Sequence, residues 1–125
     1  MLLHDFLLHA ERTSRNRTAI IDGAHRRTYG EVADRVRRAA GGLEALGLVP
    51  GSRVAIVAPN TGPFFEAYFA LSLAGLVAVP VNTRLSPAEA SFILDDSGCA
   101  ATLVDERLAH LVRGALHDRE IHFGG

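Results

Sequence analysis

The chain has 125 residues, of which 48% are hydrophobic, and its formal net charge is −1 at pH 7. This length allows one domain at most, and the hydrophobic fraction is sufficient for a core. The near-neutral charge gives no support for a nucleic-acid or anionic-membrane partner, and the single cysteine, Cys99, excludes an internal disulfide and fits a reducing compartment.

All thirteen basic residues are arginines. Because the 125 residues include no lysine, they cannot by themselves support a mechanism that needs a lysine amine. No signal peptide is predicted, because Asp5 and His9 interrupt the apolar start. The longest apolar window, residues 64–81, contains Glu66 and Pro80 and is interpreted as a helix followed by a strand rather than a membrane span. We therefore expect a cytoplasmic protein.

The first third of the chain predicts a helix, a β-hairpin and a second helix. Residues 2–14 show helical periodicity, with an apolar stripe of Leu3, Phe6, Leu7 and Ala10. Strands are expected over 18–22 and 25–28. Thr28 and Glu31 then form a capping box for a helix that reaches about Leu46. Its inward-facing residues are expected to be Val32, Val36, Ala39, Ala40, Leu43 and Leu46.

Two glycines interrupt this second helix. Gly41 and Gly42 should each cost about 1 kcal/mol against alanine, and close packing against a strand is the expected compensation. A nucleotide-binding role for them is disfavoured, because no G-x-G-x-x-G follows the first strand.

The middle of the chain alternates strands and helices. A buried strand is expected over 53–58, followed by a helix capped by Thr61 or Gly62 and ended by Gly75. The β-branched run 76–81 predicts a strand that is covered on both faces. Arg84 follows it, near the strand ends where open α/β sheets bind ligands, and its guanidinium suits phosphate.

The last third continues the alternation. Ser86 and Glu89 form a second capping box, and the helix that follows stops before Gly98. We expect a strand over 100–104, a helix over 106–116 and a last strand near 121–123. The predicted fold is an α/β, doubly wound, mostly parallel sheet with flanking helices, preceded by a helix and a hairpin, in a single domain or subdomain over residues 1–125.

Other candidate sites are better explained by structure. The six histidines show no zinc spacing, and no metal site is predicted. Cys99 lies among small apolar residues and is expected to be a buried, inert thiol. Asp95 and Asp96 are expected to be solvated or to cap a helix end rather than to act as acid and base.

Several segments together resemble the adenylate-forming enzymes, which include acyl- and aryl-CoA synthetases. L-S-L-A-G-L-V-A-V-P-V-N (71–82) is similar to the second core motif of that family, and N-T-R-L (82–85) is most like the acyl-CoA synthetase branch. R-T-Y-G-E-V (27–32), 46–60 and 86–98 also follow the pattern. Ser52 departs from this pattern, because the family usually has at that position an aspartate that makes a turn contact.

The resemblance implies ATP-dependent adenylation of a carboxylate, then thioester formation with coenzyme A, with ATP, Mg and CoA used by a full-length parent. The lysine-bearing phosphate loop and the catalytic lysine of that family have no counterpart here. The chain is therefore expected to be the amino-terminal piece of such an enzyme, inactive alone and binding no cofactor alone. In some CoA ligases of the family, the arginine that matches Arg84 contacts the CoA nucleotide phosphates.

Two kinds of partner are expected: the rest of the synthetase chain, or other copies that associate through exposed apolar surface. The alternative interpretation is a stand-alone flavodoxin-like binding or interaction module, which the alternating pattern alone allows. Asp22 and Asp105 lie near strand ends, as in receiver domains, but no lysine is present to complete such a site.

Overall fold

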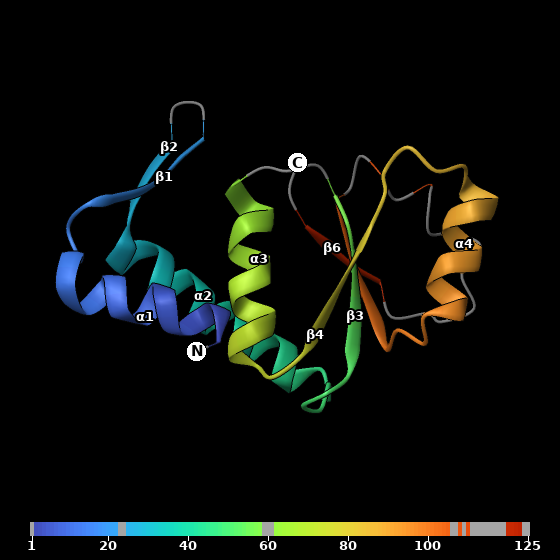
Figure 1. Ribbon diagram of the computed structural model, residues 1–125, viewed down its shortest axis with the longest axis horizontal. Helices are drawn as coiled ribbons and strands as arrows, with labels where there is room; N and C mark the ends of the chain where they lie inside the picture. Colours follow the sequence, from blue (N-terminus) through green and yellow to red (C-terminus); the bar gives the residue numbers. More distant parts are fainter. Residues whose placement is uncertain are drawn as a thin grey trace. The chain divides into compact units, whose positions relative to one another are not determined.

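The computed structural model of the protein describes residues 2–22, 25–58, 62–105, 108, 110 and 120–123, with side chains for 2–21, 26–58, 64–105, 108 and 110. These residues belong to two compact units (Figure 1). One unit comprises residues 1–50 and 60–75, and the other comprises residues 51–59 and 76–125.

The first unit contains three helices and a hairpin. Its elements are α1 (Leu3–Ser14), β1 (Thr18–Asp22), β2 (His25–Thr28), α2 (Tyr29–Ala45) and α3 (Gly62–Leu73). β1 and β2 pair antiparallel, and α2 packs against both α1 and α3. The bounds agree with the predicted segments to within two residues, and Gly75 has the left-handed φ of 75° expected of a helix C-cap. The predicted cap Thr61 lies outside the described residues.

The face that α1 buries differs from the predicted stripe. Leu7 is buried, but Leu3 and Phe6 are exposed, and Phe6 retains 61% of its surface. The inward face instead carries His4, whose backbone N–H donates to the hydroxyl oxygen of Ser72 on α3 at 3.2 Å. His4 Nδ1 lies 2.8 Å from the same Ser72 Oγ. Leu2 has no side-chain acceptor, so Ser72 caps α1 from another helix.

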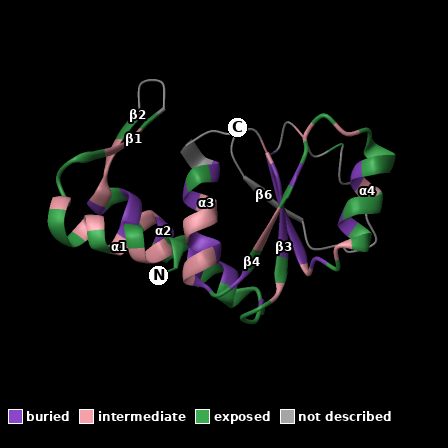
Figure 2. Cartoon of the chain, viewed as in Figure 1, coloured by how far each residue is buried: buried purple, intermediate pink, exposed green. Residues whose placement is uncertain are grey.

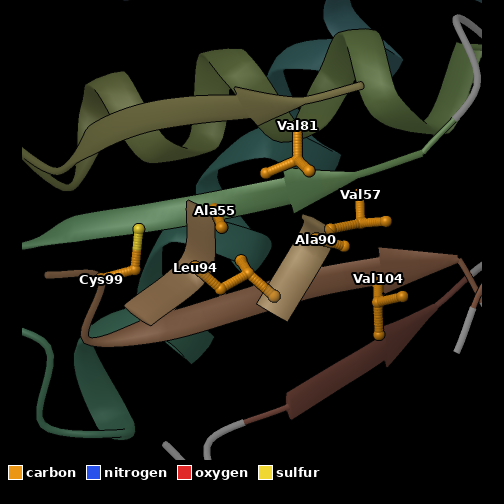
Figure 3. Packing of buried hydrophobic residues seen from close by; sticks show 7 residues of the cluster. All are labelled: Ala55, Val57, Val81, Ala90, Leu94, Cys99 and Val104. Carbon is orange, nitrogen blue, oxygen red and sulfur yellow. The ribbon is translucent and has the colours of Figure 1, made fainter. Parts of the chain in front are cut away.

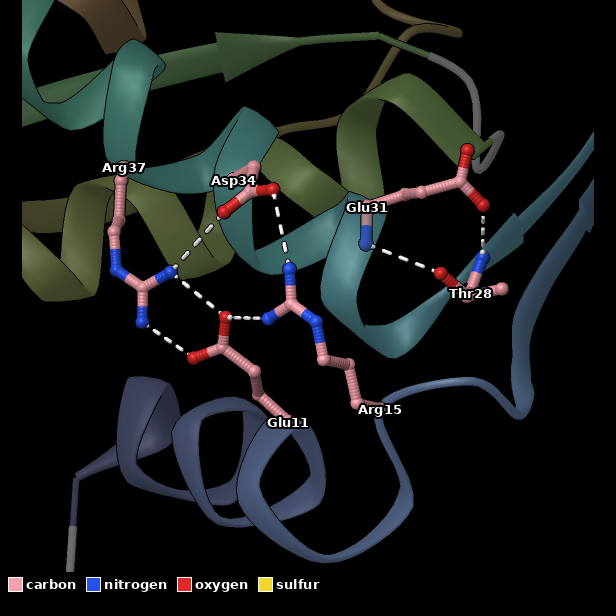
Figure 4. A network of polar contacts seen from close by, with 6 residues as sticks. All are labelled: Glu11, Arg15, Thr28, Glu31, Asp34 and Arg37. Atoms are coloured by element: carbon pink, nitrogen blue, oxygen red, sulfur yellow. Dashed lines mark hydrogen bonds and ion pairs between the residues drawn. The ribbon is translucent and has the colours of Figure 1, made fainter.

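A network of charged side chains joins α1 to α2 (Figure 4). The Glu11 carboxylate accepts hydrogen bonds from both terminal nitrogens of Arg37, and Arg15 Nη1 donates to it at 3.0 Å. Asp34 Oδ1 lies 3.4 Å from Arg37 Nη1, and Asp34 Oδ2 lies 3.7 Å from Arg15 Nη2. The hydrogen bonds from Arg37 are the largest cause that holds the pKa of Glu11 below its ordinary value of 4.5.

The predicted inward face of α2 is only partly correct. Four of the predicted residues are buried: Val32, Val36, Ala40 and Leu43. Ala33 is buried as well, although the pattern did not predict it. Ala39 is exposed because it lies at the side of the stripe that the buried residues form along α2. Leu46, at the C-cap of α2, is exposed as well. The expected packing of Gly41 and Gly42 against a strand is wrong, since an added Cβ at either would meet no atom of the other described elements within 4 Å.

The second unit is built on a parallel sheet. Its elements are β3 (Arg53–Val57), β4 (Val77–Val81), α4 (Pro87–Asp96), β5 (Ala101–Asp105) and β6 (Glu120–Phe123). The strand order is β4-β3-β5-β6, and every neighbouring pair is parallel. The chain leaves β3 toward one edge and β5 toward the other, which confirms the predicted doubly wound arrangement. The predicted helix over 106–116 lies almost entirely outside the described residues.

One face of the sheet packs on α4 (Figure 3). The cluster consists of Ala55, Val57, Val81, Ala90, Leu94, Cys99 and Val104. Figure 2 shows buried residues along β3, and the residues of its opposite face, Val54 and Ile56, are buried as well. β4 is different, because Val77 is 46% exposed and Pro80 is exposed, so the expectation that this strand is covered on both faces is wrong. Among the described residues, no helix combines the length and apolar character that a membrane span requires.

Candidate functional site

The carboxyl ends of the parallel strands form the candidate site. β3 and β5 are neighbours whose following connections run to opposite edges, and ligands of open α/β sheets bind at such a point. Ala58 follows β3, and Asp105 ends β5 with only 1% of its surface exposed. The turn 82–86 follows β4 on the other side of β3 and carries a basic residue, Arg84.

The backbone around Arg84 is fixed by a side chain two residues earlier. The Arg84 N–H donates to Asn82 Oδ1 at 2.9 Å, which closes an Asx turn directly after the strand. The Arg84 side chain is exposed, and no carboxylate of the described residues lies within 4.0 Å of its guanidinium. An ion pair between Arg84 and a carboxylate is therefore not observed in this part of the chain. All donors of the guanidinium can face an anion.

A capping box holds the far end of the same turn. Glu89 N–H donates to Ser86 Oγ at 3.2 Å, and Ser86 N–H donates to Glu89 Oε1 at 3.2 Å. These bonds to Ser86 lower the pKa of Glu89. Among the described residues, the Glu89 carboxylate accepts from the Ser86 N–H and makes no ion pair with Arg84 within 4.0 Å. The turn thus presents one cation on a backbone that is fixed at both ends.

The remaining sequence candidates are a buried thiol, two exposed carboxylates and the histidines. Cys99 is buried, as predicted, and its Sγ lies 3.2 Å from Ser97 Oγ. Asp95 and Asp96 lie in the last turn of α4 and are exposed. No three His, Cys, Asp or Glu side chains in the part of the chain with described positions gather to hold a metal ion. The side chains of Asp22 and His122, and all of His117, lie outside that part.

One partly buried ion pair was not predicted from the sequence. Glu66 is the only charged residue of α3, yet only 8% of its side chain is exposed, and its Oε2 accepts from Arg35 Nε on α2 at 2.6 Å. Its Oε1 is the one buried side-chain oxygen without a hydrogen-bond partner among the described residues. A lone carboxylate inside an apolar helix was the available signal, but its partner lies 31 positions away. The pair joins α2 to α3 within the first unit.

Comparison with known proteins gives a match over nearly the whole chain. Residues 6–122 match the family described as AMP-binding enzyme. A feruloyl-CoA synthase from an Amycolatopsis species is 42% identical over 92 residues, which are 74% of this chain and 19% of that protein.

Solved structures agree with this match. A putative long-chain-fatty-acid CoA ligase from Rhodopseudomonas palustris matches 99% of this chain and 33% of its own, with a TM-score of 0.91 and 28% identity. The N-terminal domain of FACL13 from Mycobacterium tuberculosis matches with a TM-score of 0.88 and 29% sequence identity. That match covers 98% of this chain and 34% of that domain. The chain therefore spans 19% of the length of the curated relative and a minor part of a solved N-terminal domain.

Proposed function

This chain belongs to the AMP-binding enzyme family, and from that membership we propose that it forms part of a ligase that activates a carboxylic acid with ATP and transfers the acyl group to coenzyme A. Its residues correspond to part of the N-terminal domain of such enzymes. The observation that carries the proposal is the family match over residues 6–122, together with similarity to CoA ligases of aromatic and long-chain acids. We propose a cytoplasmic location for the enzyme.

The proposed reaction has two steps. A carboxylate oxygen attacks the α-phosphorus of ATP and pyrophosphate leaves, which gives an acyl-adenylate. The thiol sulfur of coenzyme A then attacks the acyl carbon, and AMP leaves with the bonding electron pair. Both steps develop negative charge on phosphate oxygens, which cationic and N–H donors stabilise.

These residues contribute only a part of that chemistry. The 125 residues contain no lysine, and their described part holds no group of side chains that fits Mg²⁺. We propose that the catalytic lysine, the phosphate loop and the metal ligands belong to other parts of the full enzyme. The 125-residue chain is accordingly expected to form no acyl-adenylate by itself.

Arg84 is the residue that we propose for ligand binding. It follows β4 at the carboxyl end of the sheet, its guanidinium is exposed, and its backbone is fixed by Asn82. A planar guanidinium binds phosphate oxygens through paired N–H donors. Together with the resemblance of residues 82–85 to the acyl-CoA synthetase branch, this supports a contact with the nucleotide phosphates of coenzyme A.

The test of this role is Arg84→Ala in the full-length enzyme. Loss of one charge-assisted phosphate contact, worth about 2 kcal/mol, is expected to raise the KM for coenzyme A roughly thirtyfold. Adenylate formation, measured by ATP–pyrophosphate exchange, should stay unchanged. Arg38→Ala is the matched control, because Arg38 is also exposed and has no ion pair to any described carboxylate. An equal loss in both half-reactions would count against the assignment.

The proposed function itself is tested on the native protein. Its intact mass and the sequence after Gly125 should reveal a longer enzyme with a lysine-bearing phosphate loop. That enzyme should release pyrophosphate with aryl or fatty acids and then form the CoA thioester. A native product of 13.4 kDa that neither exchanges pyrophosphate nor binds ATP would overturn the proposal.

A further inference from the structure

The outer edge of β4 combines features that normally invite another strand. β4 pairs with β3 on one side, and it is the terminal strand of the described sheet. Its sequence, Val77-Ala-Val-Pro-Val81, is uncharged and rich in β-branched residues, and no charged residue occurs between Gly75 and Thr83. Uncharged, apolar edge strands pair readily with strands of other molecules.

The backbone register shows which groups this edge offers. Val77 N–H donates to Ser52 O at 2.9 Å, so the backbone polar groups of Val77 point toward β3. Because these groups alternate along a strand, those of Val79 and Val81 also point toward β3, while those of Ala78 and Pro80 point outward. Proline has no N–H, so Ala78 supplies the only outward donor within β4.

The side chains leave the same edge accessible. Val77 is 46% exposed, Pro80 is exposed, and Ala78 and Val79 are half-buried. A charged side chain could block strand pairing here, but the strand has none. Pro80 is thus the single feature of β4 that opposes pairing. Pro80 is also compatible with the pairing of β4 to β3. It lies opposite Ile56, at a position where the β4 residue donates no backbone hydrogen bond to β3.

We propose that Pro80 prevents β4 from pairing with the β4 strand of a second copy of this chain. Two copies of this edge are self-complementary around a two-fold axis, because an antiparallel pair would place Ala78 of each strand opposite Pro80 of the other. In that pair each Ala78 N–H could donate to the opposite Pro80 carbonyl. The reciprocal bond is missing, and the proline ring occupies the space in which a partner strand would approach.

The test is Pro80→Val in the 125-residue chain, compared with the unmodified chain by sedimentation velocity over a concentration series. Restoring two inter-strand donors per dimer is expected to raise the association constant about tenfold or more. Hydrogen exchange should show protection of the residue 78 and residue 80 amides in the associated form. An unchanged association constant, or association without protection at these amides, would overturn the proposal.

Two further variants separate the backbone effect from a general loss of proline. Ala78→Pro combined with Pro80→Val moves the block to the other outward position, and it should return association to the level of the unmodified chain. Pro87→Ala, at the exposed first turn of α4, should leave association unchanged. Far-UV circular dichroism establishes that each variant is folded. Strong association of the double variant or of Pro87→Ala would contradict the proposed role of Pro80.

Discussion

Gly41 and Gly42 are exposed in the interior of α2, and, outside the helix's own backbone, no atom in the described part of the chain lies within 4 Å of a Cβ added to either. Glycine costs more backbone entropy on folding than alanine, and no close contact compensates for that cost here. Gly75 is the opposite case. Its φ is 75°, and an added Cβ would lie 3.3 Å from the Cβ of Pro50.

These three positions give a prediction with opposite signs. Gly41→Ala and Gly42→Ala should each raise the free energy of unfolding by about 0.5–1 kcal/mol. Gly75→Ala should lower it by about 1–2 kcal/mol, because a side chain is strained at positive φ. Urea denaturation at low protein concentration measures all three. A loss of stability in either α2 variant would mean that these glycines make a contact that the structure lacks.

At the scale of elements, α1 is attached to its neighbours mainly by polar contacts, since Leu7 is its one fully buried side chain. The Glu11 side chain is 11% exposed and bonds to Arg37 and Arg15. Its pKa is lower in the folded chain than its ordinary value of 4.5. The stabilisation is therefore complete above that ordinary value and is lost as the pH falls through the lower, folded value.

We predict that Glu11→Gln lowers the free energy of unfolding by about 1 kcal/mol at neutral pH. This difference from the unmodified chain should shrink as the pH falls below about 4.5, and it should also shrink in high salt. Urea titrations across that pH range provide the measurement. Glu44→Gln is the control, because Glu44 is exposed on α2 without an ion pair to a described arginine. A pH-independent difference would show that Glu11 acts through packing rather than charge.

At the scale of the whole molecule, each unit exposes large apolar side chains. Phe6 and Phe65 in the first unit are both 61% exposed, and Phe92 in the second is 69% exposed. Exposed apolar groups of this size commonly mark surfaces that another part of a protein covers. This chain covers 33% of one solved relative and 26% of another. The remaining residues of those proteins could cover such surfaces.

We therefore predict that the 125-residue chain binds a fluorescent apolar dye and self-associates at high concentration. Phe92→Ser should reduce both effects while leaving the free energy of unfolding within about 0.5 kcal/mol, because surface substitutions rarely cost more. Light scattering and dye titration give the two measurements. A clean monomer that binds no dye would indicate a self-contained domain.

The sequence pattern predicts the order of elements well, because strand and helix periodicities and capping boxes are local. Thr28 with Glu31 and Ser86 with Glu89 both form the predicted boxes. The family match confirms the resemblance to adenylate-forming enzymes. The position of Arg84 after β4 is confirmed, whereas its contact with coenzyme A remains a proposal.

What the sequence does not predict depends on contacts between distant residues. The β-branched run of β4 is the same for an edge strand as for a central one, so its exposure could not be read from composition. The burial of Glu66 depends on Arg35 on another helix. The strand order β4-β3-β5-β6 is also shared by flavodoxin-like domains, so topology alone does not separate the two functional interpretations.

The hydroxyl that caps α1 has a consequence for how the protein is made. Ser72 follows His4 by 68 positions, so the first helix leaves the ribosome long before the residue that satisfies its N-terminal amide. An isolated helix of 12 residues is marginal in water. During synthesis, then, α1 should lack stable structure until α3 has been translated. The contact between His4 and Ser72 thereby makes the stability of α1 depend on a helix that is translated after it.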